Sequence, residues 1–400
     1  MGEFNFSVIL DAIRRSPEGL SRVELAGIVG LAAQTVSNIC RRLLNQNLIV
    51  EAGKYGNGPG KPRTILKLNP AGMYAVGVHL DPVETNYALL DLTGAVVIHR
   101  TLPADPEGEP AQVVQAMASE IDSIIAEAGI ERSKVAGVGV AAPGPIDGAT
   151  GVVINPPHLP RWGRVSLRED LHRELKLPVL LDKDVTAAVA AEIWAGGRSG
   201  TGSFAFIYMG TGIGAGIVLD DDVIRGSSGN AGEIGHIIAD PDGPPCDCGR
   251  RGCIKVSCMP ENILEEARKD GVKAVTKLKG ATLQESMAAL AEAAAEGDSQ
   301  ANALLNRVAE RFGTAVSVLT NLLDVDHVVF GGPFWKHFEE KFLDALPALL
   351  NELSVISEVH GLEVVGTSVS HDVGAVGAAC LVLEDTFGPN ANSLVLAEGE

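Results

Sequence analysis

The sequence predicts an α/β protein in which a small N-terminal module of helices and a hairpin precedes a larger α/β body. Three observations predict it. Apolar residues recur at helical spacing over residues 1–45, and two short strands then flank a glycine-rich turn. From about residue 71, buried strands alternate with glycine turns and helices. Because 400 residues exceed one ordinary core, we expect two or three domains.

Composition excludes several classes of protein. The chain is 46% hydrophobic and 21% charged, which is ordinary for a globular α/β protein and not for a disordered or fibrous one. No apolar run approaches the roughly 20 residues that cross a bilayer. The N-terminus carries Glu3, Asn5 and Asp11 where a signal peptide needs basic and apolar stretches. We therefore expect a cytoplasmic protein that makes no use of a membrane.

Charge is distributed unevenly along the chain. The net charge is -19, yet residues 1–70 hold nine basic and five acidic side chains. The N-terminal module is therefore positive, at +4, and the remainder carries -23. A basic module on an acidic body is able to approach DNA with one end only. Chance clustering is the alternative explanation until a motif is found.

The N-terminal module contains signals for three helices. The first has an apolar stripe made of Phe6, Ile9, Leu10 and Ile13. Ser21, followed three residues later by Glu24, predicts a capping box at the start of the second helix. Gly30 marks a tight turn after it. The third helix has a second apolar stripe, made of Val36, Ile39, Leu43 and Leu44.

The opposite face of the third helix is polar and basic. It carries Gln34, Thr35, Ser37, Asn38, Arg41 and Arg42. Such side chains reach base edges and phosphates when a helix lies in the major groove. Strands at 48–50 and 64–68 flank the turn GNGPGKPR, which predicts a wing with Lys61 and Arg63 at its tip. A three-helix interaction module would share the core pattern but would not need both basic features, so we predict a DNA-binding winged helix-turn-helix.

The body repeats one plan. Strands predicted at 74–80 and 86–91 end in a turn, and strands predicted at 204–209 and 214–219 follow the same plan about 130 residues later. Two such halves predict a duplicated α/β unit with a ligand cleft between two lobes. The Ala- and Leu-rich stretch 283–323 predicts long helices.

One cluster has the spacing of a metal site. Its residues are His236, Cys246, Cys248 and Cys253. Three thiolates and one imidazole complete a tetrahedral zinc ion with no open position, which predicts a structural rather than a catalytic zinc. The alternative is a set of thiols that lie nearby without a metal. Cys258 is the spare and should be a small buried hydrophobe.

Five motifs together resemble the ROK family of repressors, uncharacterised open reading frames and sugar kinases. They are PGPID at 143–147, GTGIGAG at 210–216, NAGEIGH at 230–236, CDCGRRGC at 246–253 and VFGGP at 329–333, and they follow the family's order. The resemblance, from about residue 5 to residue 385, implies an actin-like or hexokinase-like (ribonuclease H-like) body of two lobes. We therefore expect a winged helix at 1–70, a first lobe at 71–183 plus 370–400, and a second lobe with the zinc site at 184–369.

The resemblance also bears on catalysis. Kinases of the family carry a turn similar to D-x-G-G-T, where this chain has His79, Asp81, Pro82 and Val83. Proline has no N–H for a phosphate, and a carboxylate about 4 Å from a phosphate costs roughly 4 kcal/mol at an effective dielectric of 20. The turn GTGIGAG is intact. We therefore predict no kinase activity and no catalytic residue, although Asp184 matches the family's general base.

The positions that contact sugar hydroxyls in the family are partly kept. Glu233 and His236 match, with His236 using the ring nitrogen that is not on zinc. In place of the family's Asn, Glu and Asn, this chain has Lys183, Lys255 and His158. Two added ammonium groups indicate an anionic ligand, such as a sugar phosphate or sugar acid. The alternative is that the lysines pair with acids of the protein.

These features together predict a sugar-responsive transcription regulator, with repression as the expected sign. It should bind operator DNA as a homodimer or homotetramer and respond to a sugar or an anionic sugar derivative. An active ATP-dependent sugar kinase with an attached DNA-binding domain is the alternative. A signalling scaffold whose acidic body docks a protein partner is a third possibility, which no motif requires.

Overall fold

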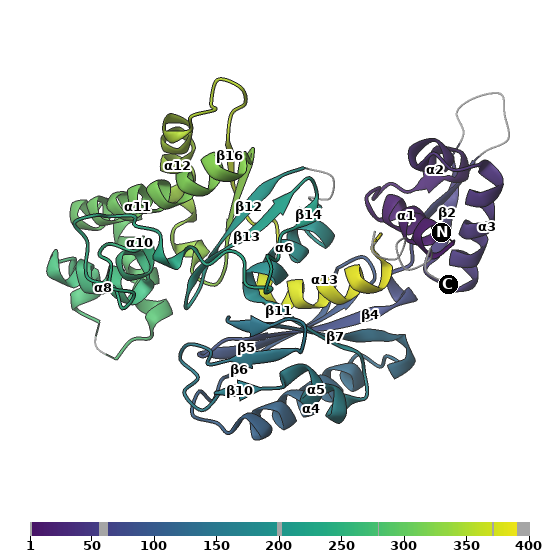
Figure 1. Cartoon of the computed structure of the whole chain (residues 1–400), viewed down its shortest axis with the longest axis horizontal. Helices are drawn as coiled ribbons and strands as arrows, with labels where there is room; N and C mark the ends of the chain where they lie inside the picture. The colour runs from purple at the N-terminus through teal and green to yellow at the C-terminus, as the bar shows by residue number, and fades with distance from the viewer. Residues whose placement is uncertain (1, 56–62, 198–201, 279, 370–371, 390–400) are drawn as a thin grey trace. The chain divides into compact units, whose positions relative to one another are not determined.

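The computed structural model describes residues 2–55, 63–197, 202–278, 280–369 and 372–389 (Figure 1). The chain forms two compact units, Met1–Ser199 with Gly374–Glu400, and Gly200–Val373. Residues 184–197, which were predicted to lie in the second lobe, therefore belong to the first unit. The division of the first unit into a winged helix and a lobe remains our proposal.

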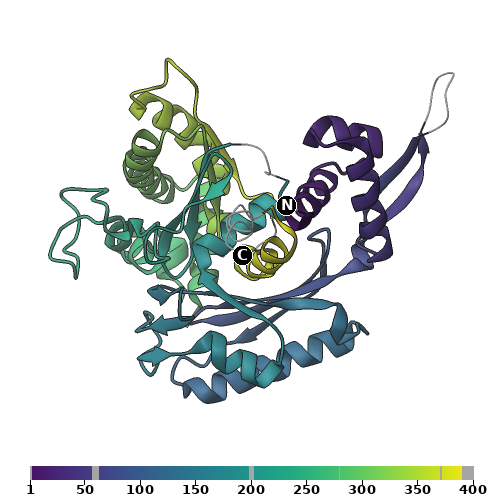
Figure 2. The ribbon, with the colours of Figure 1, turned by 45° about the vertical axis from the view of Figure 1, so that its right-hand side comes forward.

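The first 70 residues form three helices and a three-stranded sheet of order β1-β3-β2. The elements are α1 (Gly2–Arg14), β1 (Leu20–Ser21), α2 (Arg22–Val29), α3 (Ala33–Asn45), β2 (Ile49–Tyr55) and β3 (Arg63–Leu68). The β2–β3 ribbon extends away from the helices, as a wing does (Figure 2). This arrangement confirms the fold of the predicted winged helix-turn-helix.

The predicted capping box and glycine turn of this module are both present in the structure. The Ser21 hydroxyl accepts from the Glu24 N–H, and the Glu24 carboxylate accepts from the Ser21 N–H at 2.8 Å. Gly30 ends α2 with a φ of 67°, in the left-handed region that favours glycine. In α3 the buried residues are Val36, Cys40 and Leu43. Their i, i+4, i+7 spacing forms a straighter stripe than the predicted one, in which Ile39 and Leu44 are only half-buried.

Among the described residues, no single helix is both long and apolar enough to span a bilayer. Helices α2 and α3 meet that test only when taken together, and the pair is bent by 117° at its break.

The first unit contains a mixed sheet of order β11-β7-β4-β5-β6. Strands β4, β5 and β6 are antiparallel neighbours, whereas β7 runs parallel to β4 and β11 parallel to β7. Helices α4 and α5 cover one face, and α13 lies against the other (Figure 2). The elements are η1 (Pro70–Gly72), β4 (Tyr74–Leu80), β5 (Glu84–Asp91), β6 (Val96–Pro103), α4 (Pro110–Glu127), η2 (Arg132–Lys134), β7 (Val135–Ala142), β8 (Ile146–Asp147), β9 (Val152–Ile154), β10 (Arg164–Val165), α5 (Leu167–Leu175), β11 (Val179–Lys183), α6 (Asp184–Trp194) and α13 (Val373–Phe387).

The backbone of helix α13 lies in direct contact with the backbones of β7 and α6, and glycines make this close approach possible. A Cβ atom at Gly139 would lie 1.8 Å from the Ala378 carbonyl oxygen, and one at Gly377 would lie 1.8 Å from the Ala187 carbonyl oxygen. These glycines join α13 to β7 and to α6 without any room for a side chain. The C-terminal segment therefore returns to the first unit, as the resemblance implied.

The second unit contains a sheet of order β14-β13-β12-β15-β16. Strands β12 and β13 are antiparallel, and β15 and β16 continue the sheet in parallel. This is the strand order of the first sheet, so the predicted duplication is confirmed. The elements are β12 (Phe204–Met209), β13 (Ile213–Leu219), β14 (Asp222–Val223), η3 (Ile234–His236), α7 (Ile254–Cys258), α8 (Pro260–Lys269), α9 (Lys273–Thr276), α10 (Leu283–Ala295), α11 (Ser299–Leu323), β15 (His327–Gly331), η4 (Trp335–His337), α12 (Glu339–Leu353) and β16 (Glu363–Gly366).

Candidate functional site

The four predicted metal ligands lie together in the second unit. The ligand atoms of His236, Cys246, Cys248 and Cys253 are all within 4.8 Å of one another. The Cys248 and Cys253 sulfurs are 3.6 Å apart, and the Cys246 sulfur lies 3.5 Å from the His236 Nδ1. Tetrahedral bonds of about 2.3 Å to sulfur put two ligand sulfurs about 3.7 Å apart. The donor set and its spacing therefore fit a zinc ion.

A close backbone contact folds the metal loop. Gly252 has a φ of 65°, and a Cβ atom there would lie 1.4 Å from the Asp240 carbonyl oxygen. The Gly252 carbonyl accepts from the N–H groups of Ala239 and Asp240 at 2.8 and 3.1 Å. Cys253 then caps α7. Only glycine fits this approach, which returns Cys253 to the side of His236.

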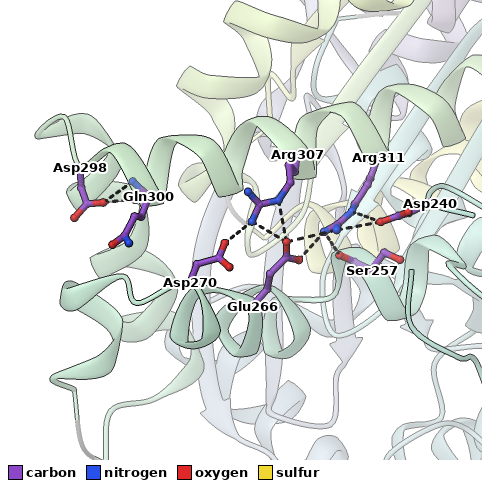
Figure 3. Close-up of polar contacts among 9 residues, drawn as sticks. Asp240, Ser257, Glu266, Asp270, Asp298, Gln300, Arg307 and Arg311 are labelled. Carbon is purple, nitrogen blue, oxygen red and sulfur yellow. Dashed lines mark hydrogen bonds and ion pairs between the residues drawn. The ribbon is translucent and has the colours of Figure 1, made fainter. Parts of the chain in front are cut away.

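Arg311 of α11 ties the two ends of this loop together (Figure 3). Its guanidinium donates to the Asp240 carboxylate at 3.1 Å, to the Ser257 carbonyl at 3.3 Å and to the Glu266 carboxylate at 2.7 Å. Arg307, one turn away, donates to Glu266 at 3.0 and 2.9 Å and also to Asp270. The three carboxylates around Arg311 and Arg307 thus connect α8 and α11 with the metal loop.

The charge state of this network depends on pH. Burial on its own raises the pKa of Glu266, but the hydrogen bonds from Arg311 and Arg307 hold it below the usual value. The lowered pKa means that the network stabilises the fold fully above the pKa of unfolded glutamate, about 4.3. The stabilisation is lost as the pH falls from there through the lower folded value.

We expect Arg311→Met to weaken the hold on the metal, because Asp240 and Ser257 then lose the group that joins them. Chelator-induced zinc release should accelerate about tenfold, a modest effect for a residue outside the ligand set. Arg307→Met is the matched control, since Arg307 binds Glu266 and Asp270 but no part of the loop. Equal release from the two variants would contradict the assignment.

Three of the predicted ligand-binding residues lie in the second unit. Glu233 is exposed at the N-cap position of η3, and the His236 ring turns its Nδ1 toward the Cys246 sulfur. The Lys255 ammonium pairs with the Asp247 carboxylate at 3.1 Å. Lys255 therefore has an acidic partner in the protein.

The other three lie in the first unit. Lys183 ends β11 and is buried, with 3% of its surface exposed. Asp184 is the first residue of α6, and its carboxylate accepts from the Val185 N–H at 2.7 Å. His158 is exposed, in a loop where its φ is 63°. The six predicted ligand-binding residues are thus divided equally between the two units.

The turn between β4 and β5 is built without phosphate-binding donors. The Asp81 carboxylate accepts from the Val83 N–H at 2.9 Å, and the Asp81 N–H donates to the Glu84 carbonyl at 3.2 Å. Pro82 has no N–H. Residues 81–83 therefore offer a buried carboxylate, and both of their N–H groups are already used. Beside the turn, His79 is buried against Gly374 of α13.

The polar face of α3 is divided. Gln34, Asn38 and Arg41 are exposed, and the Gln34 amide donates to Asn38 at 3.3 Å, whereas Thr35 and Ser37 are half-buried. Arg42 is also exposed, but its guanidinium binds both oxygens of Glu3 at 2.7 and 3.0 Å and stacks 4.5 Å from the Phe6 ring centre.

The wing is described only in part. Arg63 is exposed at the start of β3, 4.0 Å from Glu24. Lys61 lies outside the described residues.

Comparison with known proteins identifies the body. The model of the ROK family matches residues 75–385. The chain belongs to the ROK family. This ROK protein is 26% identical to the xylose repressor of Caldicellulosiruptor bescii over 92% of each chain. It is 29% identical to the glucokinase of Halalkalibacterium halodurans over 77% of this chain and 94% of that one.

A solved structure agrees with the fold of the whole ROK chain. The ROK family transcriptional regulator that is a homologue of the E. coli MLC protein covers 100% of this chain with a TM-score of 0.79 and 23% identity. That match includes the winged helix as well as the two-lobed body.

Some residues of the site were not predicted from the sequence. Asp247 was missed as the partner of Lys255, although it lies between two metal ligands. The network of Figure 3 had a usable signal, since Arg307 and Arg311 are four residues apart and so are Glu266 and Asp270. Residues four apart lie on one face of a helix, so each pair presents its two charges on a single side. Glu3 gave no signal, because its partner is 39 residues away.

Proposed function

We propose that this ROK protein is a transcriptional regulator that represses its target genes and is controlled by a sugar. One observation carries the proposal: the family match begins at residue 75, after a complete winged helix-turn-helix. The xylose repressor aligns over 92% of this chain, whereas the glucokinase aligns over 77%. The additional length corresponds to a module that a kinase does not require.

The proposed mechanism uses each part of the chain. Two winged helices of a homodimer or homotetramer bind operator half-sites one or more helical turns apart. A sugar that contacts the residues predicted from the sequence alters how the winged helices are presented. A preference of about 100-fold for one state supplies roughly 2.7 kcal/mol, enough to change operator occupancy. We place this activity in the cytoplasm, with a structural zinc ion at His236 and the three cysteines.

We propose that the chain has no kinase activity, because the turn at residues 81–83 presents a carboxylate where the family's kinases accept phosphates. ATP mixed with a panel of neutral hexoses, pentoses and acetylated amino sugars should therefore yield no ADP above background. The same preparation should retain a labelled operator duplex on a filter, which controls for folding. Sugar-dependent ADP release would instead support the alternative of a DNA-binding sugar kinase.

The lysines bear on the class of sugar, and we propose an anionic derivative. Both lysines place an ammonium group at a predicted contact position: Lys255 pairs with Asp247 at 3.1 Å, and Lys183 is buried at the end of β11. Calorimetry should show tighter binding of glucose 6-phosphate than of glucose, by about tenfold for one charge-assisted hydrogen bond. Lys183→Met and Lys255→Met should each reduce that preference. If glucose binds more tightly than glucose 6-phosphate, or more tightly than glucuronate, the two lysines pair with acids of the protein and not with a ligand.

A further inference from the structure

Arg14, the last residue of α1, is held at the C-terminal end of α6. Its guanidinium donates to the Ile193 carbonyl at 3.0 Å and to the Trp194 carbonyl at 3.4 Å. It also lies 4.4 Å from the Trp194 ring centre, in the geometry of a cation–π contact. The side chain of this charged residue is only 7% exposed. A buried arginine therefore binds the winged helix to α6 of the first lobe.

The chemistry of this contact is specific to the end of a helix. The last carbonyls of a helix have no partner within it and carry partial negative charge. Arg14 supplies donors to two of them, and Asp11 holds the guanidinium from the other side at 2.6 and 3.0 Å. The neighbouring Arg15 also binds Asp11, at 2.7 Å, but it is more exposed and no contact with α6 is described for it.

Helix α6 connects this contact with a proposed ligand residue. It begins at Asp184, and all residues from Val185 to Trp194 are buried. Its 11 residues span about 16 Å at the usual rise of a helix. Because the helix is packed on all sides, a shift at Asp184 moves the opposite end as well.

The contact is sensitive to such a shift. Helices in switching proteins move by about 1–2 Å, whereas a good N–H···O bond tolerates only a few tenths of an ångström around about 2.9 Å. The bond from Arg14 to Trp194 is already long, at 3.4 Å. A small displacement of α6 therefore breaks or strengthens the arginine's hold on the winged helix.

We propose that Arg14 is the positioning residue that couples the ligand to the DNA-binding module, with α6 as the connecting element. This inference rests on the proposed function, because it requires a sugar at Asp184. It assigns Arg14 a role in regulation and none in contacting DNA or sugar. By linkage, DNA must change the sugar affinity by the same factor as sugar changes the DNA affinity.

The test uses full-length protein and compares Arg14→Gln and Arg14→Lys with the control Arg15→Gln. The DNA probe is a duplex selected from a random library by the unaltered chain. The sugar probes are D-xylose, N-acetylglucosamine and glucose 6-phosphate. Anisotropy gives the duplex affinity with and without sugar, and calorimetry gives the sugar affinity without DNA.

In the unaltered chain, sugar should change the duplex affinity by about tenfold. Arg14→Gln should reduce this ratio to less than about twofold while sugar still binds, and Arg15→Gln should keep it. Arg14→Lys, which keeps the charge but not the planar fork, should fall between them. An unchanged ratio in both Arg14 variants would overturn the inference alone. A failure of every probe to change duplex binding by the unaltered chain would overturn the proposed function, and the inference with it.

Discussion

Replacing Cys248 by serine is expected to unfold the second unit at a much lower temperature and to remove zinc from the purified protein. A structural zinc ion contributes binding free energy of about 10 kcal/mol or more, comparable with the whole stability of a domain, about 5–15 kcal/mol. The loop from His236 to Cys253 has few core residues of its own, so a zinc ion held by the four ligands would be its main support. Calorimetric unfolding and elemental analysis of the same sample measure both effects.

Cys258→Ala provides the matched control for this prediction. Cys258 is buried five residues after the last ligand and does not belong to the metal set. Its replacement should cost some packing energy but leave about one zinc ion per chain. Sugar affinity should fall in Cys248→Ser and not in Cys258→Ala, since we propose that His236 binds both metal and sugar. Unaltered protein without zinc, or Cys248→Ser with full zinc and unchanged unfolding, would remove the metal centre from the account.

The second large effect is expected at Arg41 on the exposed face of α3. Arg41→Ala should weaken operator binding by about 1–3 kcal/mol, the usual cost of losing a base or phosphate contact. Arg42→Ala should also weaken operator binding, but partly by an indirect route. Arg42 is bound to Glu3, so its loss also loosens the packing of α1 against α3. Anisotropy with one operator duplex measures both.

Salt dependence separates this interface from unspecific adhesion. If the basic groups engage about 6 phosphates per dimer, log K falls with a slope of about -5 against log salt. Lys269→Ala is a suitable control, since Lys269 is an exposed cation of the second unit paired with Glu265. It should change neither affinity nor slope. Unchanged binding after Arg41→Ala would mean that α3 is not the recognition helix.

The fold followed from local patterns to a large extent. Strands at Tyr74–Leu80 and Phe204–Met209 were predicted with their observed bounds, because strongly apolar runs between turn residues have one plausible structure. The capping box at Ser21 and Glu24 was equally readable. Cys40 was missed as a core residue of α3, since a small thiol contributes little to an apolar pattern.

The site was less predictable where partners are distant in sequence. The metal ligands were found because their spacing is a property of one segment. Long-range pairs such as Arg14 with Trp194, or Arg42 with Glu3, depend on which helices meet, and no sequence period records that. The boundary between the two lobes was predicted after Lys183, next to a family motif. In the structure α6 belongs to the first unit, because Gly377 of α13 packs against Ala187.

The most direct measurement of the central claim is the affinity of the full chain for its selected operator duplex, titrated with glucose 6-phosphate and with neutral sugars. We expect tight binding to a two-fold symmetric sequence and release when one of these sugars is added. Duplex binding that no sugar alters, or a lack of any sequence-selective binding, would refute a sugar-responsive regulator.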